Sequence, residues 1–101
     1  MKQLVSIAFS ALREDDSIGR YGGDEFFIIL PDQTASQAIK IADRFRQNVM
    51  EQTEPPYTIS IGISTYPWDG ESHKELIKIA DDGLYKSKEL GRNRASYTGY
   101  L

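Results

Sequence analysis

A turn made of two glycines and two acids separates two short β-prone runs near the start of the chain. Between residues 18–21 and 26–30 the chain has Gly22, Gly23, Asp24 and Glu25. This pattern predicts a β-hairpin, in which the glycines could simply supply the positive φ angles of a tight turn. Glycines also let a ligand approach the backbone closely, and neighbouring carboxylates can hold Mg²⁺ together with nucleotide phosphates. The hairpin tip is therefore the first candidate site.

Two further pairs of charged residues have spacings that suit a binding site. Arg13 and Asp16 lie three residues apart before the hairpin, and Lys88 and Arg92 lie four residues apart near the end of a predicted helix. Each pair also has a plain structural interpretation. The first would be an exposed ion pair of little energetic value, and the second would offset the dipole at a helix C-terminus. Spacing alone leaves both interpretations open.

Length and composition indicate one small globular domain. The chain has 101 residues, of which 40% are hydrophobic and 27% are charged, enough for a single core. The absence of cysteine excludes disulfides, thiolate metal sites and cysteine nucleophiles, and it is compatible with a reducing cytoplasm. A formal net charge of -3 argues against a general nucleic-acid surface, although the basic residues within 86–94 can bind phosphates. No run approaches the roughly 20 apolar residues that span a bilayer, and residues 1–7 lack the pattern of a signal peptide.

Three stretches have the apolar periodicity of helices. The first covers residues 3–13, and the other two each begin at a capping box, at residues 34–37 and 72–75. The third helix is predicted to end at Gly91, because glycine readily adopts the positive φ that stops a helix.

Strand patterns lie between these helices. Residues 57–64 alternate apolar and polar side chains, which predicts a strand with one apolar face, and residues 65–70 are predicted to form a surface connection. A last short strand is predicted over residues 94–98. The resulting order is αββαβαβ, which indicates an α+β domain with helices packed on an antiparallel or mixed sheet.

Together these features resemble the GGDEF domain of diguanylate cyclases. The hairpin is similar to the signature of that family through the sequence RYGGDEF at residues 20–26. The end of the third helix is similar to the family's C-terminal signature through ADDGLYKSK at residues 80–88 and GRNR at residues 91–94. A generic interaction domain without a ligand would require every motif match to be a coincidence.

The resemblance implies a role for each candidate at the hairpin and on the third helix. Asp24 and Glu25 match the family's catalytic acids and metal ligands, which hold Mg²⁺ or Mn²⁺. The positions that contact the nucleotide and its triphosphate in the family are matched by Gly22, Gly23, Lys88 and Arg92.

The resemblance also implies a product-inhibition site. Arg13 and Asp16 form the Arg-x-x-Asp pattern that precedes the hairpin in the family, where the arginine grips phosphate and guanine and the carboxylate accepts from guanine. An arginine on the following helix completes this site in some members. Arg44 is placed for that role, with Arg46 as a near rival.

The reaction implied by the resemblance joins two GTP molecules into cyclic di-GMP. One GTP binds to each of two facing domains, so a homodimer is expected, and the 3′-hydroxyl group of each attacks the α-phosphorus of the other with loss of pyrophosphate. The expected partners are GTP and cyclic di-GMP, with no nucleic acid and no membrane contact from this segment. The expected location is the cytoplasm, either as a free domain or as the cytoplasmic part of a larger sensor protein.

Part of the family pattern has no match in the chain. GGDEF domains begin with a helix containing Asn-Arg, then a strand bearing a second metal-binding Asp, and then a loop with Phe-Lys and Asn-Asp. We therefore predict that residues 1–101 form a single truncated GGDEF domain with a ferredoxin-like palm and a mostly antiparallel sheet. We expect little enzymatic activity from the isolated chain, and binding of cyclic di-GMP is the alternative function.

The missing strand has a structural consequence under the same resemblance. In the family it lies inside the sheet, beside the strand that matches residues 26–30. Its loss would leave two unpaired edges. We therefore expect the chain either to close the sheet in a rearranged way or to exchange elements with a second copy.

Overall fold

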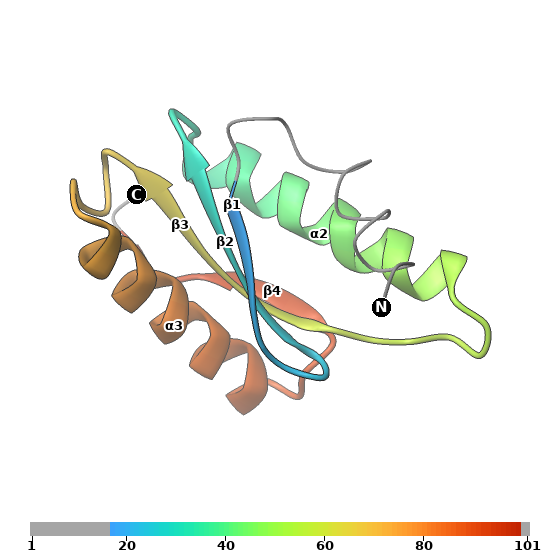
Figure 1. Ribbon diagram of the computed structural model, residues 1–101. Coiled ribbons are helices and arrows are strands. Elements are labelled where there is room, and N and C mark those ends of the chain that lie inside the picture. Colours follow the sequence, from blue (N-terminus) through green and yellow to red (C-terminus); the bar gives the residue numbers. More distant parts are fainter. Residues whose placement is uncertain (1–16, 100–101) are drawn as a thin grey trace.

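A computed structural model of the chain describes residues 17–99. The predicted helix over residues 3–13 and the candidates Arg13 and Asp16 lie outside the described residues. In chain order the described elements are β1 (Ser17–Gly22), β2 (Glu25–Pro31), α2 (Ala35–Gln52), β3 (Ser60–Tyr66), α3 (His73–Glu89) and β4 (Arg94–Tyr97) (Figure 1).

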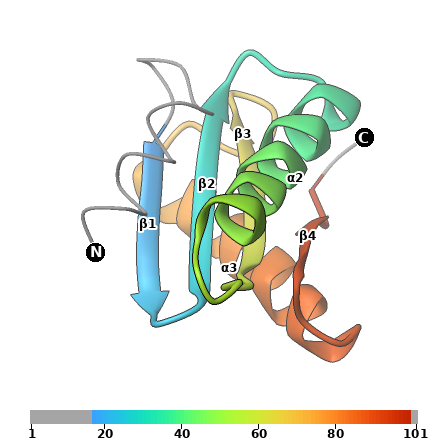
Figure 2. The same cartoon turned by 90° about the vertical axis from the view of Figure 1, so that its right-hand side faces the viewer.

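The strands form one mixed sheet in the order β1-β2-β3-β4 (Figure 2). β1 and β2 are antiparallel, whereas β2 with β3 and β3 with β4 are parallel. The predicted α+β class is confirmed, but the expectation of a mostly antiparallel sheet is wrong. The physical reason is connectivity: α2 joins β2 to β3 and α3 joins β3 to β4, and a helical connection returns the chain to the end of the sheet where the preceding strand began.

Helix α2 covers one face of the sheet. Its capping box is confirmed, since the Thr34 hydroxyl accepts from the backbone N–H of Gln37 at 3.2 Å and the Gln37 side chain accepts from the Thr34 N–H at 3.1 Å. One stripe of the helix is buried against apolar side chains of the sheet. The core between them includes Phe26, Ile28, Leu30, Ala38, Ala42, Phe45, Val49, Ile61 and Ile63.

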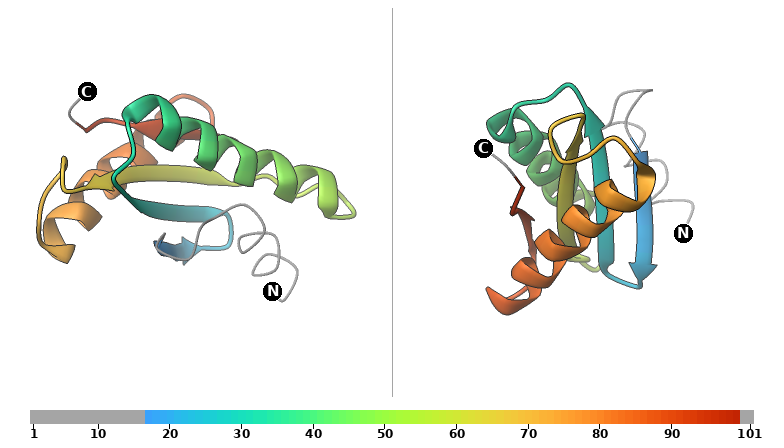
Figure 3. Two further views of the ribbon diagram at one scale, coloured as in Figure 1. Left: turned by 90° about the horizontal axis from the view of Figure 1, so that it is seen from above. Right: turned by 90° about the vertical axis from the view of Figure 1, so that its left-hand side faces the viewer.

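Helix α3 covers the opposite face, so that β3 is enclosed on both sides (Figure 3). The approach is close because β3 has a glycine where α3 crosses it: a Cβ added to Gly62 would lie 1.7 Å from the carbonyl oxygen of Ala80 and 2.4 Å from the backbone nitrogen of Leu84. On the helix side, a Cβ added to Gly83 would lie 3.2 Å from the Cα of Gly62. Two glycines therefore set the distance between α3 and the sheet.

Strand β3 differs from its prediction in position and in burial. It covers Ser60–Tyr66 instead of residues 57–64, because Thr65 and Tyr66 pair with Leu30 and Pro31 of β2. The strand was expected to have one apolar face. Both of its faces are buried instead, since α2 covers the isoleucines and α3 covers the small residues between them.

The described sheet contains no gap beside β2. Phe26 pairs with Arg20 of β1 on one side and with Ile61 of β3 on the other. Of the two arrangements expected from the missing strand, this structure has the directly closed sheet. Neither α2 nor α3 is long and apolar enough to cross a membrane.

The first prediction concerns the close approach of α3. Replacing Gly62 by alanine places a methyl group inside the backbone of α3, so we expect the free energy of unfolding to fall by roughly 2 kcal/mol or more. Gly22→Ala is a matched control, because a Cβ at Gly22 meets nothing within 4 Å, and it should change stability by less than about 1 kcal/mol. Urea unfolding followed by circular dichroism measures both. Equal losses in the two variants would contradict the packing described.

A second prediction concerns the start of α3. Hydrogen bonds from Ser72 and from the Glu71 backbone lower the pKa of Glu75 below its ordinary value of 4.5. A lowered folded-state pKa stabilises the fold above the unfolded-state pKa, and this stability is lost as the pH falls through the folded value. Glu75→Gln should therefore be less stable than the original chain at pH 7, with a difference that shrinks below about pH 4.5.

The control for this prediction is Glu51→Gln, which removes the same charge from an exposed position on α2. Urea midpoints at neutral pH and at acidic pH give the comparison. A Glu75→Gln deficit that stays constant across this range would show that the carboxylate charge plays no part in the cap.

Candidate functional site

The glycines at the hairpin tip are not required by the fold. Gly22 and Gly23 do not have positive φ angles, so the interpretation that they supply the conformation of a tight turn is wrong. A Cβ added to Gly22 would meet nothing within 4 Å, and one added to Gly23 would meet only the Tyr57 hydroxyl at 3.5 Å, an ordinary contact. The two positions leave an open backbone surface that a ligand could approach.

The carbonyl groups of the tip are held from within the protein. Arg20 donates from Nε to the Gly22 oxygen at 2.8 Å and from Nη2 to the Gly23 oxygen at 3.0 Å. The Tyr57 hydroxyl also donates to the Gly23 oxygen, and the backbone N–H of Ser60 donates to the Asp24 oxygen at 2.8 Å. These internal hydrogen bonds fix the shape of the tip.

Sequence reasoning did not assign these supporting roles. Arg20 belongs to the matched motif. Residues two apart in a strand lie on the same face, so the spacing of Arg20 and Gly22 was the signal that could have placed the Arg20 side chain near the turn. Tyr57 lies 34 residues from the glycine that it contacts. No local pattern could reveal that pairing, because it depends on where β3 begins.

The structure brings Lys88 and Arg92 together with Glu25. Lys88 Nζ lies 3.4 Å from Glu25 Oε1, and Arg92 Nη1 lies 3.9 Å from Glu25 Oε2. The side chains retain 33%, 55% and 27% of their exposure for Lys88, Arg92 and Glu25, so solvent weakens these ion pairs. The predicted phosphate ligands thus lie beside the predicted metal ligand, with contacts weak enough to be exchanged for a ligand.

The end of α3 turns sharply toward β4. Gly91 has a φ of 114°, which confirms the predicted stop, but Arg92 and Asn93 also have positive φ values of 66° and 48°. The Arg92 N–H donates to the Ser87 oxygen at 2.9 Å, which closes the turn. The positive φ of Arg92 was not foreseeable from residue type, because arginine rarely adopts it.

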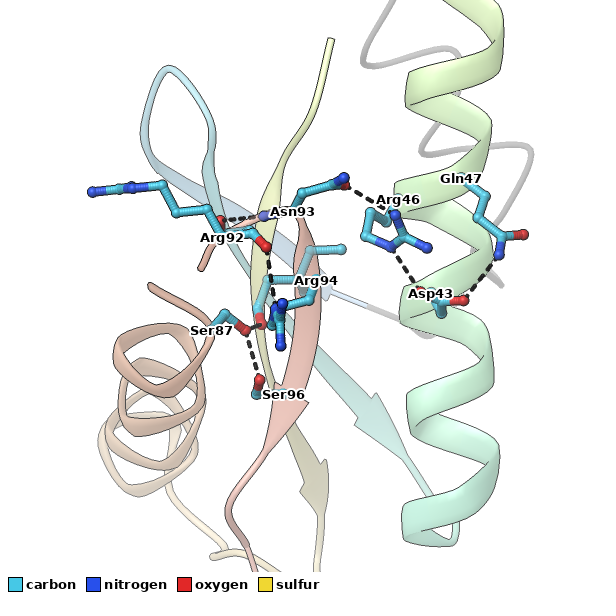
Figure 4. A network of polar contacts seen from close by, with 10 residues as sticks. Asp43, Arg46, Gln47, Ser87, Arg92, Asn93, Arg94 and Ser96 are labelled. Carbon is cyan, nitrogen blue, oxygen red and sulfur yellow. Dashed lines mark hydrogen bonds and ion pairs between the residues drawn. The ribbon is translucent and has the colours of Figure 1, made fainter. Parts of the chain in front are cut away.

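The two arginines on α2 have different surroundings. Arg46 is largely buried, with 15% of its side chain exposed, and lies 2.7 Å from Asp43. Its Nη1 also donates to the Asn93 side chain at 2.9 Å (Figure 4). Arg44 is exposed. Arg46 is therefore engaged in the fold, whereas Arg44 is exposed among the described residues 17–99.

Tyr21 lies in β1 of the hairpin and packs against Phe27 of β2. Its ring lies 5.1 Å from that of Phe27. Burial, and then the nearby carboxylate of Asp81, raise the pKa of Tyr21 above its ordinary value of 10.0. Its hydroxyl is therefore neutral at physiological pH and cannot act as a base there.

Metal-binding groups are few in the described part of the chain. No three acidic or imidazole side chains converge within residues 17–99. Asp24 and Glu25 are adjacent at the hairpin tip, which suits Mg²⁺ only in its usual form, with one or two carboxylates and the remaining oxygens from phosphates and water.

Comparison with known proteins identifies the family of the chain. Residues 1–94 match the family described as diguanylate cyclase, GGDEF domain. Diguanylate cyclase A of Treponema denticola is 39% identical over 102 residues, covering 95% of the chain and 28% of that protein. The probable diguanylate cyclase DgcT of Escherichia coli is 36% identical over 93% of the chain and 23% of its own length. The response regulator PleD of Caulobacter vibrioides is 38% identical over 83% of the chain and 20% of its own length.

The chain thus spans between 20% and 28% of the length of these relatives. The family match covers the hairpin and the basic end of α3 alike. The chain belongs to the diguanylate cyclase GGDEF domain family.

Proposed function

We propose that the described residues form the nucleotide-binding part of a diguanylate cyclase. In that reaction the 3′-hydroxyl oxygen of one GTP bonds to the α-phosphorus of another, the bond to the pyrophosphate leaving group breaks, and a second such step closes cyclic di-GMP. Relatives named as diguanylate cyclases support this proposal. We further propose that the whole protein acts in the cytoplasm and as a homodimer, with one GTP on each of two facing domains.

The open backbone at Gly22 and Gly23 is the observation on which this proposal rests. The fold demands glycine at neither position, by space or by backbone conformation. A side chain at Gly22 would project into solvent, where it would obstruct only a ligand lying against the hairpin. A nucleotide in that place explains both glycines.

The basic pair on the other side of the site fits a triphosphate. Lys88 lies in the last turn of α3, and Arg92 lies in the connection after it. Both contact Glu25, the first residue of β2. An arginine can bind phosphate through two parallel hydrogen bonds, and a lysine adds a compact charge. Phosphate oxygens would replace the Glu25 carboxylate as their partners.

A divalent metal would bind between the hairpin acids and the nucleotide. Asp24 and Glu25 would hold it, with phosphate oxygens and water as the other ligands. When bound, Mg²⁺ would neutralise charge on the phosphates. Because the described residues supply two acids to this site, and both oxygens of Glu25 already face cations, we propose that the isolated chain makes little cyclic di-GMP.

Calorimetric titration with GTP in excess Mg²⁺ tests the proposed site. We expect Gly22→Ala and Lys88→Ala each to weaken GTP binding by about tenfold, a loss typical of a blocked approach or a missing charged hydrogen bond. Lys40→Ala is the control for charge, because Lys40 is exposed on α2. The urea midpoint of Gly22→Ala is the control for stability.

Two results would contradict the proposal. One is equal GTP affinity in the original chain and Gly22→Ala. The other is a Lys40→Ala loss as large as that of Lys88→Ala, which would indicate attraction by overall charge alone. The same samples, assayed for cyclic di-GMP, should form far less product than an intact cyclase domain.

The second candidate function is binding of cyclic di-GMP by Arg13, Asp16 and Arg44. The supporting observation is that Arg44 is exposed while Arg46 is held by Asp43 and Asn93. This arrangement favours Arg44 as the third member of the product site. Arg13 and Asp16 remain predictions from the sequence.

Calorimetry with cyclic di-GMP distinguishes this function from substrate binding. Arg44→Ala should weaken dinucleotide binding by about tenfold while leaving GTP affinity within twofold, since a charged hydrogen bond to phosphate is lost only in the first case. Lys40→Ala, which removes a charge from the same helix, should leave both affinities unchanged. No binding of the dinucleotide to the original chain would remove this function.

A further inference from the structure

The connection from α3 to β4 has an unusual backbone at the residue proposed to bind phosphate. Gly91, Arg92 and Asn93 follow one another with φ values of 114°, 66° and 48°. Glycine and asparagine tolerate the left-handed region, but arginine is disfavoured there. Such a conformation persists only where surrounding contacts hold it, and it is often found at functional sites.

The contacts that hold this turn come from three directions. The Arg92 N–H donates to the carbonyl oxygen of Ser87, at the end of α3, at 2.9 Å. The Asn93 N–H donates to the hydroxyl of Ser60, at the start of β3, at 3.3 Å. The Asn93 side chain accepts from Arg46 of α2 at 2.9 Å, which joins segments 47 residues apart (Figure 4).

Arg46 is itself fixed in place. Its Nε donates to Asp43 Oδ1 at 2.7 Å, and the other oxygen of Asp43 accepts from Gln47 at 3.1 Å. The guanidinium group is planar and therefore has a defined direction once one edge is bonded. Asp43 thus orients the Arg46 guanidinium group so that its remaining N–H donors point toward Asn93.

We propose that Arg46 is a positioning residue for Arg92. It acts through Asn93: by holding the Asn93 side chain, Arg46 keeps the turn in its left-handed conformation and Arg92 beside Glu25 at the hairpin. This inference rests on the proposed binding of a nucleotide triphosphate by Arg92. Without Arg46 the turn would relax toward ordinary φ values and point Arg92 away from the site.

The main alternative is that Arg46 contributes only to stability, by joining α2 to the rest of the domain. The two interpretations differ in what happens once Arg92 is already lost. A positioning role requires Arg92 to be present, so Arg46→Ala should have no further effect on GTP affinity in an Arg92→Ala chain. A purely structural role would give the same loss in either background.

The first experiment is titration calorimetry of the 101-residue chain with GTP and Mg²⁺. Arg46→Ala should weaken binding roughly fivefold, the change that corresponds to loss of one hydrogen bond. Asn93→Gly should weaken it similarly, because glycine keeps the positive φ but removes the acceptor for Arg46. Lys40→Ala, with the same change of charge on the same helix, should leave affinity unchanged.

A second measurement does not need the nucleotide. Amide hydrogen exchange at Arg92 should accelerate in Arg46→Ala and in Asn93→Gly, exchange at Asn93 should accelerate in Arg46→Ala, and both rates should remain unchanged in Lys40→Ala. If the original chain does not bind GTP, the proposed function fails, while the exchange data still decide whether Arg46 holds the turn. Unchanged exchange at the Arg92 amide in Arg46→Ala and Asn93→Gly, or equal losses of GTP affinity from Arg46→Ala with and without Arg92, would overturn the inference.

Discussion

The close contact between α3 and β3 determines how the rest of the domain is arranged. At Gly62 and Gly83 the helix and the strand approach so closely that neither position can hold a Cβ without displacing backbone. Ser87, one turn further along α3, donates to the Ile61 oxygen at 2.9 Å and accepts from the Ser96 hydroxyl at 2.8 Å. These contacts fix the position of α3 along the sheet and its rotation about its own axis. Lys88, the next residue, is thereby placed where its side chain reaches Glu25 of the hairpin.

The sheet register brings the other parts of the site to the same level. Glu25 pairs with Ser60, and Ser60 pairs with Arg94, so three strands begin side by side. The residues before these strands are the hairpin tip, the Tyr57 segment and the turn that contains Arg92. The parallel pairing of β2, β3 and β4 thus brings these three segments together at the end of the sheet where the strands begin. Their polar groups meet there, outside the apolar core.

Local signals predicted the parts of this structure that local chemistry controls. Both capping boxes, the hairpin and the stop at Gly91 depend on contacts within a few residues, and all of them appear as predicted. The motif match also predicted that Lys88 and Arg92 belong to the same site as Glu25, and the structure places these three side chains side by side. For the capping boxes and the stop at Gly91, the pattern of residue types is itself the physical cause of the feature.

Features that depend on distant partners were missed or misread. The limits of β3 follow from its pairing with β2, and its buried second face follows from α3, neither of which can be seen in residues 57–66 alone. The bond between Arg46 and Asn93 joins segments without any shared pattern. Gly22 and Gly23 stay predicted nucleotide contacts, and residue type could not show that neither of them has a positive φ in the folded chain.

In this candidate site, the Glu25 carboxylate would compete with a bound phosphate for Lys88 and Arg92. Because the carboxylate lies beside both Lys88 and Arg92, a polyphosphate bound as proposed would exchange one anionic partner for another, and its net affinity would be only the difference between them. A divalent ion drawn to Glu25 would reverse this balance by releasing Lys88 and Arg92 as it binds. The metal and the nucleotide would then bind cooperatively. Each would raise the affinity of the protein for the other, and the Glu25 carboxylate would couple the two binding events.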